Sequence, residues 1–194
     1  MATPKWMEKA EARAISKRVK QSRKSELRVA EALTGKRTPG SGSRPRSFMG
    51  EGTDGYDIST SRFAVEHKGT DKDFMSLQVT WIVKIFNAAK FLGKDPLLVL
   101  TFNNADDSDR DWVLMPRHVA ERYDLAIPQP QLELKSVARV RPDDLRKLTI
   151  VSERLHIPWV VAKLSTFIEA STLNQPQLRL LSRALRSAPF KARF

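Results

Sequence analysis

The chain has 194 residues, a hydrophobic content of 41% and a formal net charge of +12, which fits a globular domain, with or without an extension, that binds acidic partners. No apolar run approaches the roughly 20 residues that span a bilayer, and the N-terminus has no signal-peptide pattern, so we expect no membrane partner. Zero cysteines and three scattered histidines exclude disulfides, thiolate catalysis and metal sites built from Cys or clustered His.

Residues 4–33 predict one long helix, or two consecutive ones. They contain no Gly and no Pro after the first position, and they are rich in Ala, Lys, Arg and Glu. Leu27, Ala30 and Leu33 fall on one stripe that we expect to be buried, and Gly35 is a natural end for the helix.

Glu26 lies at the edge of this stripe. Taken with the helix alone, it is an exposed carboxylate paired with Arg23 or Lys24, because ion pairs of this kind are common on helix surfaces. Its assignment therefore depends on what the rest of the chain places beside it.

Residues 36–55, KRTPGSGSRPRSFMGEGTDG, predict a loop rich in Gly, Ser, Pro and Arg. Four glycines between Thr38 and Gly52 allow backbone amides to approach a phosphate closely. No G-K-[ST] sequence follows them, so this is not a Walker A loop and we expect no nucleotide cofactor. The loop is either a flexible linker or a DNA contact whose charge comes from Lys36, Arg37, Arg44 and Arg46.

Residues 56–59 and 63–68 predict a β-hairpin that ends at Gly69. Side chains alternate between the faces of a strand, so Glu66 and Lys68 share one face and His67 points to the other. The Glu-x-Lys arrangement can therefore act as a unit.

A second carboxylate comes from the first strand of this hairpin, where the pleat can aim it at the same point as Glu66. Asp57 is preferred because it stands between two large β-forming residues, whereas Asp54 precedes Gly55 and resembles turn chemistry. Asp54 remains the alternative.

Residues 72–92 predict a buried amphipathic helix that stops at Gly93. Gln78 lies on its packed side, where an amide needs a partner such as Lys68 or a phosphate. A Gln at a helix margin is otherwise an ordinary surface residue.

Residues 96–102 predict a strand buried on both faces, and residues 111–115 predict a second strand, followed by a helix from Pro116 to Tyr123. The order of elements gives an α/β fold with a mixed sheet. We expect residues 1–21 to form a basic helical extension and residues 22–124 to form the core.

Residues 125–194 predict a basic C-terminal extension. It contains a short helix near residues 141–150, a strand at 158–164 and a basic helix after Pro176. The extension either packs on the core or serves dimerisation or DNA contact.

Charge is unevenly distributed. Residues 1–50 carry 13 Lys or Arg against 4 Asp or Glu, residues 51–110 carry 7 against 10, and residues 111–194 carry 14 against 8. An acidic centre between basic flanks indicates a carboxylate pocket for a metal inside a surface that binds phosphates. With no Cys or His cluster, the metal would have oxygen ligands, as Mg²⁺ or Mn²⁺ prefers.

In order, Glu26, the Gly/Ser loop, Asp57, Glu66-x-Lys68 and Gln78 resemble the PD-(D/E)XK nuclease superfamily. The Glu-bearing helix followed by TPGSGS is most similar to the small Holliday-junction resolvases of archaea and phages, over about residues 22–123. Tyr56 stands where the family signature has Pro, and the short spacing from Asp57 to Glu66 keeps Asp54 as an alternative.

The resemblance implies a restriction-endonuclease-like fold, with a mixed central sheet flanked by helices and helical N- and C-terminal extensions. It also implies a catalytic set of Glu26, Asp57, Glu66, Lys68 and Gln78. Mg²⁺, replaceable by Mn²⁺, would be held by Asp57, Glu66, Glu26 and the backbone carbonyl of His67, while Lys68 would orient or deprotonate the attacking water. Ser41 and Ser43 would contact phosphate.

The sequence thus predicts a cytoplasmic, nucleoid-associated endonuclease, or one in the host cytoplasm if phage-encoded, that acts as a homodimer on branched DNA such as four-way junctions. Two alternatives remain: a repair, recombination or restriction nuclease on linear duplex, and a structural DNA-binding protein whose Glu-x-Lys is vestigial.

Overall fold

A computed structural model describes residues 5–38, 56–146 and 148–173 of the chain. Its central feature is an eight-stranded mixed sheet with the strand order β1-β2-β3-β5-β6-β10-β9-β7. The pairs β3–β5 and β7–β9 are parallel, and the other neighbours are antiparallel. The strands of this sheet are β1 (Lys36–Arg37), β2 (Ile58–Ser59), β3 (Phe63–Thr70), β5 (Asp95–Phe102), β6 (Asp111–Pro116), β7 (Gln131–Glu133), β9 (Thr149–Ser152) and β10 (Leu155–Lys163).

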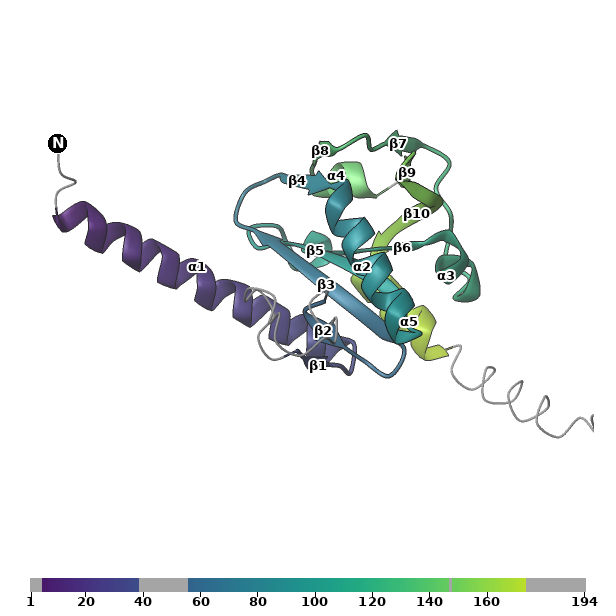
Figure 1. Ribbon diagram of the computed structural model, residues 1–194, viewed down its shortest axis with the longest axis horizontal. Coiled ribbons are helices and arrows are strands. Elements are labelled where there is room, and N and C mark those ends of the chain that lie inside the picture. Colours follow the sequence, from purple (N-terminus) through teal and green to yellow (C-terminus); the bar gives the residue numbers. More distant parts are fainter. Residues whose placement is uncertain (1–4, 39–55, 147, 174–194) are drawn as a thin grey trace, which may run out of the picture.

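A smaller antiparallel pair and several helices cover the sheet (Figure 1). The pair consists of β4 (Met75–Gln78) and β8 (Val137–Val140). The helices are α1 (Lys5–Ala32), α2 (Val79–Leu92), α3 (Arg117–Arg122), α4 (Pro142–Leu145) and α5 (Leu164–Leu173), with a 3₁₀ turn η1 (Asp107–Asp109) before β6. Among the described helices, none has the length and apolar content that a membrane crossing needs. The expected α/β architecture with a mixed central sheet flanked by helices is confirmed.

The sheet separates two apolar cores. On one face, side chains of α2, β4, β8 and α4 pack against alternate residues such as Ala64, Leu98 and Trp112. On the other face, α1, α3 and α5 pack against the intervening residues such as Val65 and Val99. This alternation follows from the pleat, and it places Glu66 and Lys68 on the α2 face and His67 on the α1 face.

Strand β5 is buried on both faces, as predicted from its continuous apolar sequence. The predicted hairpin is also present, with Ile58 opposite Val65. Helix α2 ends at Gly93, whose φ of 62° is the left-handed conformation expected of a glycine helix stop.

The expectation of a helix over residues 72–92 was wrong at its start. Residues Met75–Gln78 form β4, which pairs with β8 some sixty positions later in the chain, and the helix begins only at Val79. Its buried side is consequently formed by Val79, Ile82, Ile85 and Ala89.

The buried stripe of α1 also differs from the prediction. Ala30 and Leu33 are buried as expected and Val29 joins them, but Leu27 is 51% exposed. The helix ends as predicted near Gly35, whose N–H donates to the Ala30 carbonyl at 2.8 Å. Two residues of the expected loop, Lys36 and Arg37, form β1 instead. The predicted helix after Pro176 and most of the Gly/Ser loop lie outside the described residues.

Candidate active site

The candidate site lies where the β2–β3 hairpin meets α1 and α2. Asp57 immediately precedes β2, and its N–H donates to the Val65 carbonyl at 2.8 Å. Its carboxylate Oδ2 accepts the N–H of His67 at 2.8 Å. β2 contains only two residues, so this carboxylate takes the place of a backbone acceptor beside β3 and is fixed next to the Glu66–His67 peptide.

Glu66 is the most deeply buried carboxylate of the site, with 1% of its surface exposed. Lys68 Nζ donates to its Oε1 at 2.6 Å, and Lys84 Nζ of α2 lies 3.3 Å from Oε1 and 3.4 Å from Oε2. A buried carboxylate requires such charged partners, because removing an ion from water is costly. The contact between Glu66 and Lys68 confirms that the two residues share one face of β3.

Lys68 is held by a second neighbour, the ring of Trp81 on α2, whose centroid lies 5.6 Å from its Nζ. The ammonium group therefore lies between a carboxylate and an aromatic face, both of which attract its positive charge. Lys68 and Lys84 remain partly exposed, at 30% and 48% of their side chains, so both can reach a ligand from solvent.

Glu26 comes from α1 and reaches the edge of the sheet. Its Oε2 accepts from Arg37 Nε of β1 at 2.5 Å, and its Oε1 accepts from Ser22 Oγ at 3.2 Å. The side chain is only 12% exposed, so Glu26 is not the surface carboxylate of a helical ion pair. Its ion-pair partner, Arg37, belongs to β1 and not to α1.

Three carboxylates act on one another at this site. The pKa of Asp57 is raised, first by burial and then by the negative charge of Glu66, with a further contribution from Glu26; the His67 N–H and Lys68 oppose the rise. Ionised Asp57 is therefore disfavoured unless a cation arrives.

The donor set fits a hard divalent cation, because it consists of carboxylate oxygens. Within the described residues, however, no three Asp, Glu, His or Cys side chains lie close enough to share a metal ion as they stand. Two of these carboxylates are engaged with protein cations: Glu66 accepts from Lys68 and Lys84, and Glu26 accepts from Arg37. A metal at this site would compete with these protein cations for the carboxylate oxygens.

On the opposite face of β3, His67 belongs to a buried polar chain. Thr101 Oγ1 donates to Asp111 Oδ1 at 2.6 Å, and Arg28 of α1 donates to the same oxygen at 2.8 Å. Because the hydroxyl proton of Thr101 is used on Asp111, its oxygen accepts from His67 Nε2–H at 2.9 Å. The chain connects α1, β6 and β5 to the middle residue of Glu-x-Lys.

Of the predicted set, Glu66 and Lys68 are in direct contact, Asp57 accepts the adjacent His67 N–H, and the charges of Glu66 and Glu26 act on Asp57. Gln78 is the last residue of β4, and the contact found for its Oε1 is with Thr80 Oγ1 at 3.3 Å, not with Lys68. Of the predicted DNA contacts, Lys36 is exposed on β1 and Arg37 binds Glu26. Asp54, Ser41, Ser43, Arg44 and Arg46 lie outside the described residues, and the roles of the whole set stay predictions.

Sequence reasoning missed Lys84. Its signal was present, because Lys84 is the sole charge in the segment VTWIVKIFNAA and falls three residues after Trp81, on the same side of the helix. The chain of His67, Thr101 and Asp111 was missed as well, although a Thr inside the apolar run PLLVLTF marks it.

No family model matches the sequence, and no curated protein matches it either. Among solved structures, the chain is similar to Hjc of Archaeoglobus fulgidus, a Holliday junction resolvase from an archaeal hyperthermophile. The match covers 52% of this chain and 76% of that chain, at 17% sequence identity and a TM-score of 0.36. The case for a function therefore rests on the side chains of the candidate site.

Proposed function

We propose that the chain is a Mg²⁺-dependent endonuclease that hydrolyses DNA phosphodiester bonds. The observation that carries this proposal is the buried Glu66 carboxylate between Lys68 and Lys84, with Asp57, just before β2, bound to the N–H of the next residue, His67. Carboxylates for a metal and ammonium groups for a phosphate are the two requirements of metal-assisted phosphodiester hydrolysis.

Asp57 and Glu66 would hold the metal, with Glu26 and the His67 carbonyl completing its shell. A divalent ion bound there lowers the pKa of its water and neutralises charge on the phosphate. Asp57 is suited to this role because burial and the negative charges of Glu66 and Glu26 raise its pKa, and a cation would offset both effects. Mn²⁺ offers the same preference for oxygen ligands and would substitute.

Lys68 and Lys84 would serve the phosphate and the attacking water. Both ammonium groups contact the Glu66 carboxylate. With a metal on Glu66, these donors would be available to the scissile group: Lys68 would orient or deprotonate the water, and Lys84 would stabilise negative charge on the phosphate oxygens. Gln78, at the N-terminus of α2, remains a candidate for contact with the substrate.

The proposed substrate is branched DNA, with the four-way junction as the best candidate, cut by a homodimer. Its support is the resemblance of the ordered motif set to Holliday-junction resolvases and the net charge of +12, which suits a polyanion. Paired incisions in a junction require two sites, which a dimer supplies.

The deciding experiment is cleavage of an end-labelled four-way junction and a matched linear duplex in Mg²⁺, Mn²⁺ and Ca²⁺. We expect symmetric nicks in the junction with Mg²⁺ or Mn²⁺. Glu66→Gln should reduce the rate by roughly 100-fold or more, because several kcal/mol of transition-state stabilisation depend on the metal. Glu121→Gln is the matched control, since Glu121 is an exposed carboxylate that pairs with Arg117.

A second arm compares Lys84→Gln with Lys90→Gln, an exposed lysine on the same helix. We expect the first change alone to slow cleavage. Equal rates for wild type and Glu66→Gln would contradict the proposed site, and faster cutting of linear duplex than of the junction would keep the nuclease but reject the substrate.

A second candidate is a DNA-binding protein without catalysis. The observation that favours it is that Glu66 and Glu26 are already paired with Lys68, Lys84 and Arg37. Binding of both DNAs with no cleavage in any of the three metals would support this reading and overturn the nuclease.

A further inference from the structure

Helix α1 extends far beyond the surface on which it packs. Its last turns pack on β1, β2 and β3 through buried residues that begin at Ser25. Residues 19–24 are exposed or half-buried, and Figure 1 shows the preceding turns running outward from the sheet. A helix of 28 residues is about 42 Å long, so roughly 30 Å of it lies beyond the packed end.

The protruding part is strongly basic. Residues 5–24 contain eight Lys or Arg and two Glu. Six of the cations recur at intervals of three or four residues, which places them along one side of the helix. These six are Lys5, Lys9, Arg13, Lys17, Lys20 and Lys24, called the basic stripe below.

The acidic residues of this segment do not interrupt the basic stripe. By helical position Glu8 is in line with Glu26, because the 18 residues from one to the other make five full turns, and Glu11 lies about 60° further round, away from the stripe. The side that carries Glu26 is also the side that packs on the sheet, whereas Lys20 and Lys24, the stripe residues nearest the packed end, are exposed. Among the described residues, Lys20, Arg23 and Lys24 have no carboxylate partner.

We propose that the basic stripe of α1 binds the phosphate backbone of a DNA duplex arm, independently of base sequence. Charge complementarity favours DNA as the partner. The cations extend along about 29 Å of helix, and a DNA duplex carries one negative charge per ~1.7 Å. The segment from Lys17 to Lys24, KRVKQSRK, adds only Val19, Gln21 and Ser22 to its cations, so most of its polar side chains suit phosphate contacts.

This inference rests on the proposed function for its partner and adds the surface that holds it. The stripe ends at Lys24, two residues before Glu26, so a duplex arm along α1 extends to the level of the candidate site. The same helix would then carry a metal ligand at its packed end and a DNA contact along its protruding part.

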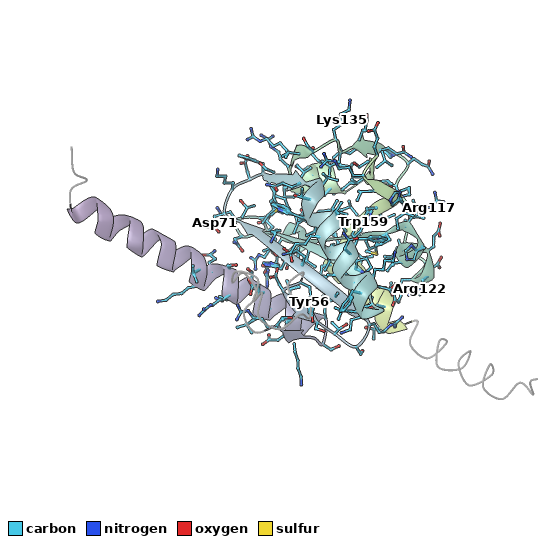
Figure 2. The ribbon with its side chains drawn as sticks, in the orientation of Figure 1. Tyr56, Asp71, Arg117, Arg122, Lys135 and Trp159 are labelled. Atoms are coloured by element: carbon cyan, nitrogen blue, oxygen red, sulfur yellow. The ribbon has the colours of Figure 1, made fainter. Side chains whose placement is uncertain are left out.

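The test uses the full chain with Arg13, Lys17 and Lys20 changed together to Gln, which retains helix propensity. Its matched control changes three exposed cations on the core, Lys90, Lys135 and Arg154, to Gln, with the same loss of charge. Figure 2 shows Lys135 on the far side of the core from α1. Binding of duplex and four-way junction is measured in EDTA over a range of KCl concentrations, so that cleavage plays no part.

We expect the stripe variant to bind DNA at least roughly 10-fold more weakly and its slope of log K against log[salt] to fall by about three, one unit for each lost phosphate contact. The control variant should change affinity less than roughly threefold. Circular dichroism and sedimentation accompany both variants. Equal affinities of the stripe variant and the control would overturn the proposal, as would a dimer in wild type that the stripe substitutions dissociate.

The proposed nuclease activity and the proposed DNA contact of the basic stripe can be refuted independently of each other. DNA that binds through the stripe in EDTA but is never cut in Mg²⁺ would keep this inference and remove the catalytic one. Cleavage that persists at saturating concentrations of a stripe variant with unchanged affinity would keep the nuclease and remove the stripe.

Discussion

At the scale of single residues, Glu66 and His67 are neighbours in opposite environments. Glu66 contacts Lys68 and Lys84 on the α2 face. His67 is buried on the α1 face, where its pKa is lowered to about 3 by burial and then by the positive charges of Lys68 and Arg28. Adjacent residues of β3 therefore contribute a carboxylate with two lysine partners on one face and a neutral, buried histidine on the other.

The neutral His67 makes stability depend on pH. In the unfolded chain its pKa is near 6.5, whereas in the fold it is about 3, so below pH 6.5 the unfolded state binds the additional proton. The stabilisation is complete above pH 6.5 and declines as the pH falls toward 3, by about 1.4 kcal/mol per pH unit. Relative to His67→Gln, we expect wild type to lose about 2 kcal/mol between pH 7.5 and pH 5.

Urea denaturation of both proteins in EDTA measures this difference, since all other titrating groups are shared and no metal contributes. Gln keeps an N–H donor for Thr101 but cannot titrate. Curves of unfolding free energy that stay parallel across this pH range would show that His67 is not the group responsible.

At the scale of elements, the position of Glu26 depends on how closely α1 approaches β2. A Cβ added to Gly35 would lie 2.8 Å from Thr60 Cγ2, 3.0 Å from Ile58 Cγ2 and 3.1 Å from the Ser59 carbonyl oxygen. These contacts are too short for any larger side chain, and two of the three atoms belong to a strand that pairs with β3. Gly35 thus allows the helix that bears Glu26 to close on the hairpin that bears Asp57.

Gly35→Ala should destabilise the protein by about 1–3 kcal/mol and lower DNA cleavage, because overpacking displaces the end of α1 together with Glu26. Gly93→Ala is the control: its added Cβ meets nothing within 4 Å, but the φ of 62° costs a non-glycine residue about 1–2 kcal/mol. Both variants should lose stability in urea, and only Gly35→Ala should lose activity beyond that. Unimpaired cleavage by folded Gly35→Ala would contradict this role of the contact.

The same elements show what local sequence could reveal. The β2–β3 hairpin and β5 were predictable because alternation and an apolar run are properties of neighbouring residues, and the shared face of Glu66 and Lys68 follows from them. The start of α2 was not, because Met75–Gln78 becomes a strand only by pairing with β8. The contacts of Glu66 with Lys84 and of Glu26 with Arg37 likewise depend on packing between elements.

At the scale of the whole molecule, the candidate site stores unfavourable charge that a metal would relieve. The pKa of Asp57 is raised, so at neutral pH its ionised form opposes folding: the group favours the fold below its unfolded pKa of about 3.8 and disfavours it above its folded pKa. Replacing Asp57 by Asn removes this charge and keeps an oxygen for the His67 N–H. In EDTA at pH 7.5, Asp57→Asn should therefore be at least as stable as wild type.

Mg²⁺ or Ca²⁺ should reverse that order. A ligand that binds only the folded state at 100 times its Kd adds about 2.7 kcal/mol, or roughly 5–10 °C in Tm for a domain of this size, and Asp57→Asn should lose most of the gain. Thermal unfolding of wild type, Asp57→Asn and the exposed-site control Glu153→Gln measures both halves. Equal increases of Tm in all three proteins would place the cation elsewhere. If Asp57→Asn is the more stable protein in EDTA and wild type is the more stable one with the cation, the Asp57 charge both weakens the fold and binds the metal.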